Sequence, residues 1–226
     1  MNRQITASPG TTGPALLVRD ILHGLSEGRY VPGQRLVEPD LVLQYGVSRS
    51  TVREALGRLV AGGVVAQAPH RGARLRRLTR REARDLLRVT ECLLGLAARE
   101  AAEAVAEGAD PAPLAEAAEH LRQAPPEGEA RARARYYRAL VALGGNSELQ
   151  RQLPALQIHL VRAQLRGLRG DNPDAHGAIV QAIAAARPDE AEARARAHLT
   201  ALIARLAELP ESAFALTRPD GGAGTP

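Results

Sequence analysis

Residues 36–76 read LVEPDLVLQYGVSRSTVREALGRLVAGGVVAQAPHRGARLR, and this stretch decides the fold of the first third of the chain. A short helix is expected to begin near Glu38 and Pro39, because a first helical turn tolerates proline, whose missing N–H has no intrahelical partner there. Gly46 is expected to end it, since glycine accepts a positive φ just past a helix without a steric penalty. Ser48 then offers a favourable N-cap, so the stretch predicts a second helix after a tight turn.

The second helix is predicted to have one buried face and one cationic face. Its apolar side chains recur at helical spacing, at positions 52, 55, 56, 59 and 60. Arg49, Ser50 and Arg53 fall elsewhere around the helix, so its exposed N-terminal end is polar and positively charged. Gly62 and Gly63 are expected to stop the helix.

A β-hairpin is predicted directly after this helix. An extended segment runs from Val64 to Pro69, residues 70–72 form the tip, and residues 73–76 alternate small or apolar with charged side chains. This alternation gives a strand with one buried and one cationic face. A helix-turn-helix followed by such a hairpin is the plan of a winged helix, whose second helix enters the DNA major groove, where arginine can bond to guanine.

Positive charge is concentrated in the same part of the chain. Residues 1–80 hold 12 Arg against 5 acidic residues, a balance of +7, whereas residues 81–226 hold 18 Arg against 20 acidic residues, a balance of −2. A localised basic surface attracts a polyanion, so double-stranded DNA is the expected partner.

At these residues the chain resembles the GntR family of bacterial transcription regulators. The matching words are GRYVPGQRL (28–36), GVSRSTVREALGRLVAGGVV (46–65) and HRG (70–72), and the resemblance covers roughly residues 15–78. It implies that operator DNA is contacted by residues of the turn, the second helix and the hairpin tip, namely Arg35, Ser48, Arg49, Ser50, Thr51, Arg53, His70, Arg71 and Gly72. Val37 departs from the family pattern, which often has a hydroxyl residue there to cap the helix that begins near Glu38.

Composition divides the chain into two domains with short tails. A winged-helix domain is expected at 14–78 and an all-helical domain at 79–211, whereas 1–13 and 212–226 are rich in Gly, Pro and Thr and are expected to be disordered. No run approaches the ~18 apolar residues of a membrane span, and the N-terminus lacks the apolar core of a signal peptide, so a cytoplasmic protein is expected. Cys92, the single cysteine, is interpreted as a buried packing residue rather than a reactive thiol.

Helical periodicity runs through the whole second domain, so the predicted fold class is mainly α, a winged helix-turn-helix followed by an all-helical bundle. Six helices are expected, around 86–101, 114–121, 136–143 and 149–165 (bent at Pro154), then one capped by Asn172-Pro173 and one from Pro188 to about Leu209. This arrangement resembles the FCD class of the GntR family, in its shorter six-helix, VanR-like branch. The resemblance rests on YYRALVALGGNSEL (136–149), on HGAIVQAIAAARPDEAEARARAHL (176–199) and on the length.

The FCD resemblance implies a domain that dimerises the protein and holds a small effector, commonly a carboxylate, often beside a divalent metal. His176 and His198 are predicted to point inward on neighbouring helices, either into this pocket or into a core where backbone carbonyls satisfy them. Arg133 and Tyr137, however, stand where the family has an Asp and a His ligand. Zinc normally requires three or four protein ligands and a guanidinium repels a dication, so no metal cofactor is expected, and His176 and His198 are remnant positions.

An anionic effector is the alternative occupant of this pocket. Arg133, Tyr137, His176 and His198 together supply a bidentate donor, a phenol and two imidazoles, which predicts binding of a small carboxylate. Alternatively, the Arg133 side chain lies on a solvent-exposed face of its helix, because the surrounding stretch EARARARYYR alternates Ala and Arg.

The leading hypothesis is a homodimeric transcription regulator, with repression expected and activation left open, that reads a pseudo-palindromic operator and is controlled by this effector. Two alternatives stay open, an effector-blind or architectural DNA-binding protein with a degenerate pocket and a metal-dependent module tethered to DNA. An enzyme is not expected, because the sequence contains no phosphate loop, no H-E-x-x-H motif and no Ser or Cys nucleophile beside a histidine motif.

Overall fold

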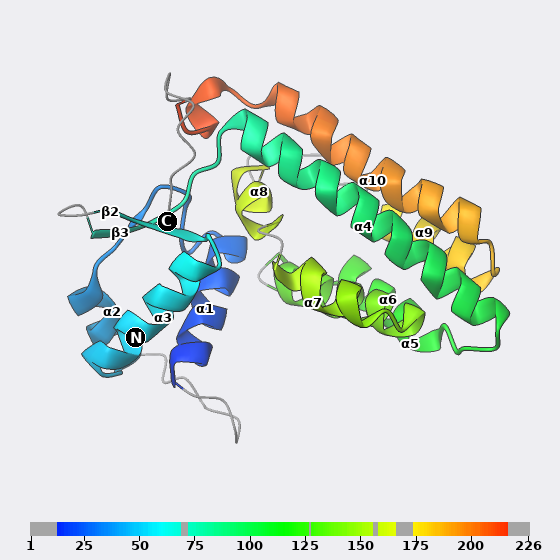
Figure 1. Ribbon diagram of the computed structural model, residues 1–226, viewed down its shortest axis with the longest axis horizontal. Coiled ribbons are helices and arrows are strands. Elements are labelled where there is room, and N and C mark those ends of the chain that lie inside the picture. Colours follow the sequence, from blue (N-terminus) through cyan, green and yellow to red (C-terminus); the bar gives the residue numbers. More distant parts are fainter. Residues whose placement is uncertain (1–12, 69–71, 127, 156–157, 166–173, 217–226) are drawn as a thin grey trace.

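The structure is a computed structural model that describes residues 13–68, 72–126, 128–155, 158–165 and 174–216. A winged helix is followed by an all-helical domain, which confirms the predicted fold class (Figure 1). The last strand of the winged helix ends at Leu75 and the first helix of the second domain begins at Arg80. Within these ranges, no helix has both the length and the apolar character that a membrane span requires.

The winged helix consists of α1 (Gly13–Glu27), β1 (Arg35–Leu36), α2 (Glu38–Tyr45), α3 (Arg49–Ala61), β2 (Val65–Ala68) and β3 (Gly72–Leu75). Strand β3 lies between β1 and β2 and pairs antiparallel with both. Gly46 ends α2 in the left-handed conformation with a φ of 64°, and Ser48 caps α3 by accepting a hydrogen bond from the Thr51 N–H, as predicted. Val37 precedes α2 without a side-chain cap.

A partly buried polar network, which the sequence analysis did not find, joins α1 to α2. Tyr45 donates to Asp20 Oδ2 at 2.6 Å, its hydroxyl lies 2.7 Å from that of Tyr30, and Arg29 donates two hydrogen bonds of 3.0 Å to the Asp20 carboxylate. Burial by itself raises the pKa of Asp20, but the hydrogen bonds from Arg29 and Tyr45 outweigh it and hold the pKa below its ordinary value of 3.8. The network therefore ties α1 to the helix-turn-helix through a charged carboxylate.

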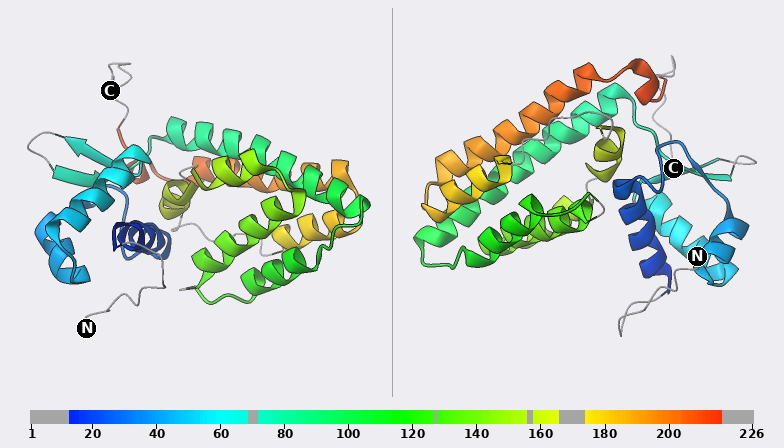
Figure 2. Two further views of the ribbon diagram at one scale, coloured as in Figure 1. Left: turned by 60° about the horizontal axis from the view of Figure 1, so that its bottom comes forward. Right: turned by 180° about the vertical axis from the view of Figure 1, so that it is seen from behind.

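The helical domain, as far as it is described, consists of α4 (Arg80–Ala106), α5 (Ala112–Arg122), α6 (Glu129–Gly144), α7 (Ser147–Ala155), α8 (Ile158–Leu165), α9 (Ala175–Ala184), α10 (Pro188–Glu208) and a 3-10 turn, η1 (Glu211–Ala213). Helices α4 and α10 run side by side in opposite directions along the domain (Figures 1 and 2). Helices α6 and α9 pack against α4, and α5 packs against both of them. A capping box starts α4, in which Thr79 and Glu82 each accept a hydrogen bond from the other's backbone N–H.

The core of the helical domain lies between α4, α6, α9 and α10. Leu87, Leu94, Leu140, Ile183 and Leu202 are each at most 3% exposed. Full burial of an aliphatic side chain of this size contributes about 1.5–3 kcal/mol, so these residues hold the four helices together.

Three details differ from the prediction or fall outside the described residues. The predicted fourth helix is two helices, α7 and α8, with residues 156–157 between them outside the described ranges. The Asn172-Pro173 cap also lies outside those ranges, and α9 begins at Ala175. The prediction for Cys92 is wrong, because this residue falls in line with Val89 and Leu96 on the exposed side of α4.

Candidate functional site

The N-terminal end of α3 presents hydroxyls and an arginine to solvent. Ser48 Oγ lies 2.7 Å from Ser50 Oγ and 2.8 Å from Thr51 Oγ1. Arg49 is exposed and forms no ion pair within the described part of the chain. Because a helix N-terminus also carries a partial positive charge, this end of α3 suits a phosphate or the acceptor atoms of a base edge.

Arg53 lies one turn after Arg49 on the same face of α3. Its Nε is 3.0 Å from Oε2 of Glu38 on α2, and its side chain is 69% exposed. An ion pair this exposed contributes about 0–1 kcal/mol, so DNA can compete for the guanidinium. The pair holds Arg53 beside α2, and its contact with operator DNA stays a prediction.

The small sheet forms a second cationic surface. Arg35 on β1 lies directly opposite Arg74 on β3, and both side chains are exposed. Like charges opposite each other on paired strands are destabilising unless an anion lies between them. Gly72 begins β3 with a φ of 70°. His70 and Arg71 lie outside the described residues, so their operator contacts stay predictions.

Three of the predicted effector residues meet inside the helical domain. The Tyr137 hydroxyl on α6 lies 3.4 Å from His176 Nε2 on α9, and the ring centroids of His176 and His198, the latter on α10, are 4.7 Å apart. Both histidines are buried, as the spacing predicts. Tyr136 completes the group and packs edge-on against His176 at a centroid distance of 4.7 Å.

Arg162 on α8 belongs to the same group, although the sequence analysis did not identify it. Its Nη2 donates to the Tyr137 hydroxyl at 3.2 Å, and its Nε is buried without a hydrogen-bond partner in the described structure. No described carboxylate forms an ion pair with it. The signal in the sequence was a lone arginine in the mostly apolar stretch IHLVRAQL, residues 158–165. We define the polar cluster as Tyr136, Tyr137, Arg162, His176 and His198.

The chemistry of the polar cluster favours a negatively charged ligand. Burial, with a smaller contribution from Tyr137, raises the pKa of Tyr136 well above its ordinary value of 10.0, so this phenol stays neutral. The remaining members are a guanidinium, a second phenol and two imidazoles, all able to donate hydrogen bonds. Because the cluster contains donors and a fixed positive charge but no carboxylate, it is suited to an anion.

Arg133, the predicted principal anion donor, lies on α6 one turn before Tyr137. Its side chain is 15% exposed and forms an ion pair with Glu129 on the preceding turn. The carboxylate of Glu129 offsets the charge of Arg133, so its part in effector binding stays a prediction. Among the described contacts, Arg162 is an arginine that donates to Tyr137 directly, which places it in the polar cluster.

Divalent metals, which often bind in the class that the sequence resembles, do not fit these residues. The five described residues of the polar cluster are two imidazoles, two phenols and a guanidinium, so none of its members is a carboxylate that would offset the charge of a dication. Among the described residues, no group of three or more His, Cys, Asp or Glu side chains is arranged to hold a metal ion. We therefore assign no metal chemistry to the polar cluster.

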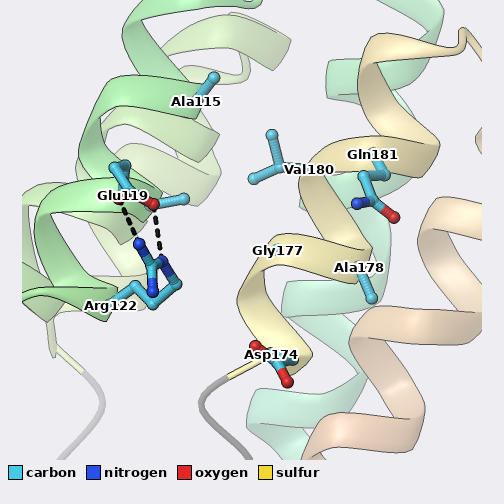
Figure 3. Close-up of a pocket in the computed structure, with 9 residues that line it drawn as sticks. Ala115, Glu119, Arg122, Asp174, Gly177, Ala178, Val180 and Gln181 are labelled. Carbon is cyan, nitrogen blue, oxygen red and sulfur yellow. Dashed lines mark hydrogen bonds and ion pairs between the residues drawn. The ribbon is translucent and has the colours of Figure 1, made fainter.

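A groove of about 400 Å³ lies between α5 and α9 and shares no lining residue with the polar cluster (Figure 3). Its charged side chains are Glu119, Arg122 and Asp174, and Arg122 already donates two hydrogen bonds to Glu119. With two acidic side chains and one paired arginine, the groove suits an anion less well than the polar cluster does.

Comparisons with known families match both halves of the chain. Residues 17–75 match the family described as "Bacterial regulatory proteins, gntR family", and residues 85–201 match the FCD domain. A relative named "Probable D-xylose utilization operon transcriptional repressor", from Paenarthrobacter nicotinovorans, is 28% identical over 201 residues, covering 85% of this chain and 88% of that protein. The HTH-type transcriptional regulator McbR of Escherichia coli is 34% identical over 110 residues, which cover 49% of each chain.

Solved structures show the same fold. E. coli McbR/YncC has a TM-score of 0.74 at 22% identity and covers 88% of this chain and 98% of its own. A putative GntR regulator from Rhodococcus sp. RHA1 has a TM-score of 0.71 at 22% identity, over 88% of this chain and 99% of its own. The relatives named among these proteins are transcriptional regulators rather than enzymes.

Proposed function

Because the chain belongs to the GntR family of bacterial transcriptional regulators and carries an FCD domain, we propose that it is a homodimeric repressor whose operator affinity a small carboxylate controls. The proposal of a carboxylate effector rests on Arg162. Its guanidinium has no described carboxylate partner and donates to Tyr137, whose hydroxyl lies beside His176. Repression is supported by the name of the relative from P. nicotinovorans. The protein would act in the cytoplasm, where its DNA is.

The exposed N-terminal end of α3 is proposed to contact the bases of the operator. The small sheet is proposed to contact the phosphate backbone of the DNA. Arg49 and Arg53 are one turn apart and both exposed, which allows both to reach base edges in one major groove. Arg35 and Arg74 lie side by side on the exposed face of the sheet, where one phosphate could accept from both. Non-specific affinity would then come mainly from the sheet and sequence preference from α3.

A carboxylate is the proposed effector because its charge and geometry match the guanidinium and the hydrogen-bond donors of the polar cluster. A guanidinium can bind a carboxylate through two parallel hydrogen bonds, and Tyr137 and the imidazoles can donate to the remaining oxygen lone pairs. Low exposure strengthens such charge-assisted hydrogen bonds, because little water competes for the donors. The effector would bind by replacing the bond between Arg162 and Tyr137.

Dimerisation is proposed through the exposed face of α4. Val89 and Leu96, seven residues apart, are 51% and 39% exposed, and Leu93 between them is only partly buried. Exposed apolar side chains aligned along one helix face offer a surface that a second copy of the chain could cover. A self-complementary α4 face would create a two-fold axis, and two α3 helices related by it would read an inverted repeat.

Selection from a random duplex pool tests the proposed function with the full-length protein. The enriched sequences should be inverted repeats, and sedimentation should show a dimer that becomes a monomer in the Val89→Asp/Leu96→Asp variant. Arg88→Asp, at an exposed position beside this stripe, is the matched control and should stay dimeric. Enrichment of a single half-site by a monomeric wild-type protein would contradict the dimeric proposal.

A further inference from the structure

A side chain of α8 bonds to Leu78, which lies in the linker between the end of β3 at Leu75 and the start of α4 at Arg80. Gln164 Oε1 accepts a hydrogen bond from the Leu78 N–H at 3.0 Å, and Gln164 Nε2 donates to the Leu78 carbonyl at 3.1 Å. One amide thus pairs with both backbone groups of one residue, as a neighbouring strand would. Gln164 is 8% exposed and Leu78 is 2% exposed, so these bonds are shielded from water.

The C-terminal segment completes the same junction. Gln164 Nε2 also donates to the Ala213 carbonyl at 2.9 Å, and the Ala215 N–H donates to the Leu78 carbonyl at 3.0 Å. Arg80 donates to the carbonyl of Leu209 at 2.8 Å and stacks over the Phe214 ring. The end of the linker is therefore held to the C-terminal segment after α10, and among the described residues Gln164 is the α8 side chain that bonds to it.

Helix α8 contacts three parts of the protein, namely the polar cluster, the linker and α1. Arg162 reaches from it to Tyr137 in the polar cluster, Gln164 reaches to the linker, and the helix packs directly against α1 of the winged helix. Figures 1 and 2 show α8 between the winged helix and the α4–α10 pair. Arg162 and Gln164 are two residues apart in one helical turn, so a shift that moves one also moves the other.

We propose that α8 is the element that couples the polar cluster to the DNA-reading domain, with Gln164 as the positioning residue that holds the linker. This inference rests on the proposed function. When an anion replaces the Tyr137 hydroxyl as the partner of Arg162, α8 shifts, and the Gln164–Leu78 pair lengthens or re-forms in another register. Because a buried amide without its partner is costly, such a junction favours discrete arrangements over a gradual drift. The effector thereby changes the position of α1 and of α3.

A double-mutant cycle tests the coupling without requiring the effector. Tyr137→Phe removes the hydroxyl that Arg162 contacts, and Gln164→Met removes the linker bonds at similar side-chain volume. The measured quantity is the affinity of the full-length protein for a duplex selected from a random pool. Tyr137→Phe should change this affinity by about fivefold or more in the wild-type background and by less than about twofold in Gln164→Met. Gln150→Met, an exposed glutamine on α7, is the control and should leave the effect of Tyr137→Phe intact.

The same factor in both backgrounds, or no effect of Tyr137→Phe in the wild type, would overturn the coupling role. If Gln164→Met does not fold, as judged by circular dichroism, Gln164→Glu replaces it, because it retains an acceptor for the Leu78 N–H but loses both donors. Thermal melts with benzoate, malonate or citrate report separately on the effector proposal. A carboxylate that stabilises the wild type and Gln164→Met equally shows that the effector site is intact in the variant. If none of the three carboxylates stabilises the protein, the carboxylate proposal fails. The double-mutant cycle still decides whether α8 couples the polar cluster to DNA binding.

Discussion

Arg162 on α8 donates a hydrogen bond to the Tyr137 hydroxyl on α6 at 3.2 Å, across 25 residues of sequence. A phenol is a weak substitute for a carboxylate as a partner of a guanidinium. The contact therefore marks a place where an incoming anion gains a charge-assisted hydrogen bond and displaces only a neutral one. The effector proposal depends on this difference.

Replacing Arg162 should abolish stabilisation by carboxylates. A ligand at 100 times its Kd raises the free energy of unfolding by about 2.7 kcal/mol, which thermal denaturation detects readily. Arg162→Ala and the milder Tyr137→Phe should lose most of this gain. Arg151→Ala removes an exposed arginine of α7 that pairs with Glu148, so its response should match that of the wild type. If carboxylates stabilise Arg162→Ala as much as the wild type, they do not bind in the polar cluster.

Arg49 and Arg74 should affect DNA binding in different ways. Arg49→Ala should cost about 1–3 kcal/mol at the selected duplex and relax the sequence preference, because it is proposed to contact a base. Arg74→Ala should weaken binding to selected and random duplexes alike and reduce the salt dependence, as loss of a phosphate contact does. Arg58→Ala, at the other end of α3 and paired with Glu54, is the control. Equal losses on both duplexes for Arg49→Ala would contradict base reading.

Asp20 should make stability depend on pH in a predictable direction. Its folded-state pKa lies below the ordinary value of 3.8, so the ionised carboxylate stabilises the fold above about that pH, and this contribution is lost as the pH falls through the folded-state pKa. Asp20→Asn should therefore lower the free energy of unfolding at pH 7, and the gap to the wild type should close in acid. Urea denaturation measures this difference in the free energy of unfolding. Circular dichroism follows the unfolding, because the chain has no tryptophan for fluorescence. Asp40→Asn, at an exposed position of α2, should show no such gap.

Purified protein should carry no stoichiometric zinc, nickel or manganese, and chelators should leave DNA binding unchanged. The reason is the composition of the polar cluster, which combines two imidazoles with a guanidinium that donates to Tyr137. Elemental analysis provides the measurement. About one metal ion per chain, lost in His176→Ala, would mean that a ligand outside the polar cluster completes a metal site.

Local chemistry explains why much of the winged helix could be predicted from the sequence. The positive φ at Gly46 and the Ser48 cap depend on neighbours within a few residues, and these signals are written directly in the chain. His176 and His198 were expected to point inward from helical spacing alone. Each of these features follows from one segment and does not depend on how distant segments pack.

Features that depend on packing between distant segments could not be predicted in the same way. The Asp20–Tyr45 bond and the Arg162–Tyr137 bond each join residues 25 positions apart on different helices. The exposure of Cys92 depends on which side of α4 is covered by α10, and periodicity marks an apolar face without stating what covers it. Gln164 pairs with Leu78 across 86 residues, and nothing near either residue indicates the other.

The most direct test of the central claim is a titration of the protein–DNA complex with carboxylates. The full-length protein is bound to its selected duplex, and fluorescence anisotropy of the labelled DNA follows the addition of mono-, di- and tricarboxylates, each beside its uncharged amide analogue. At least one carboxylate should lower the operator affinity by about tenfold, its amide should not, and Arg162→Ala should bind the duplex without responding. Release of DNA from Arg162→Ala at the wild-type carboxylate concentration, or equal release by the amide, would contradict control of this protein by an anion in the polar cluster.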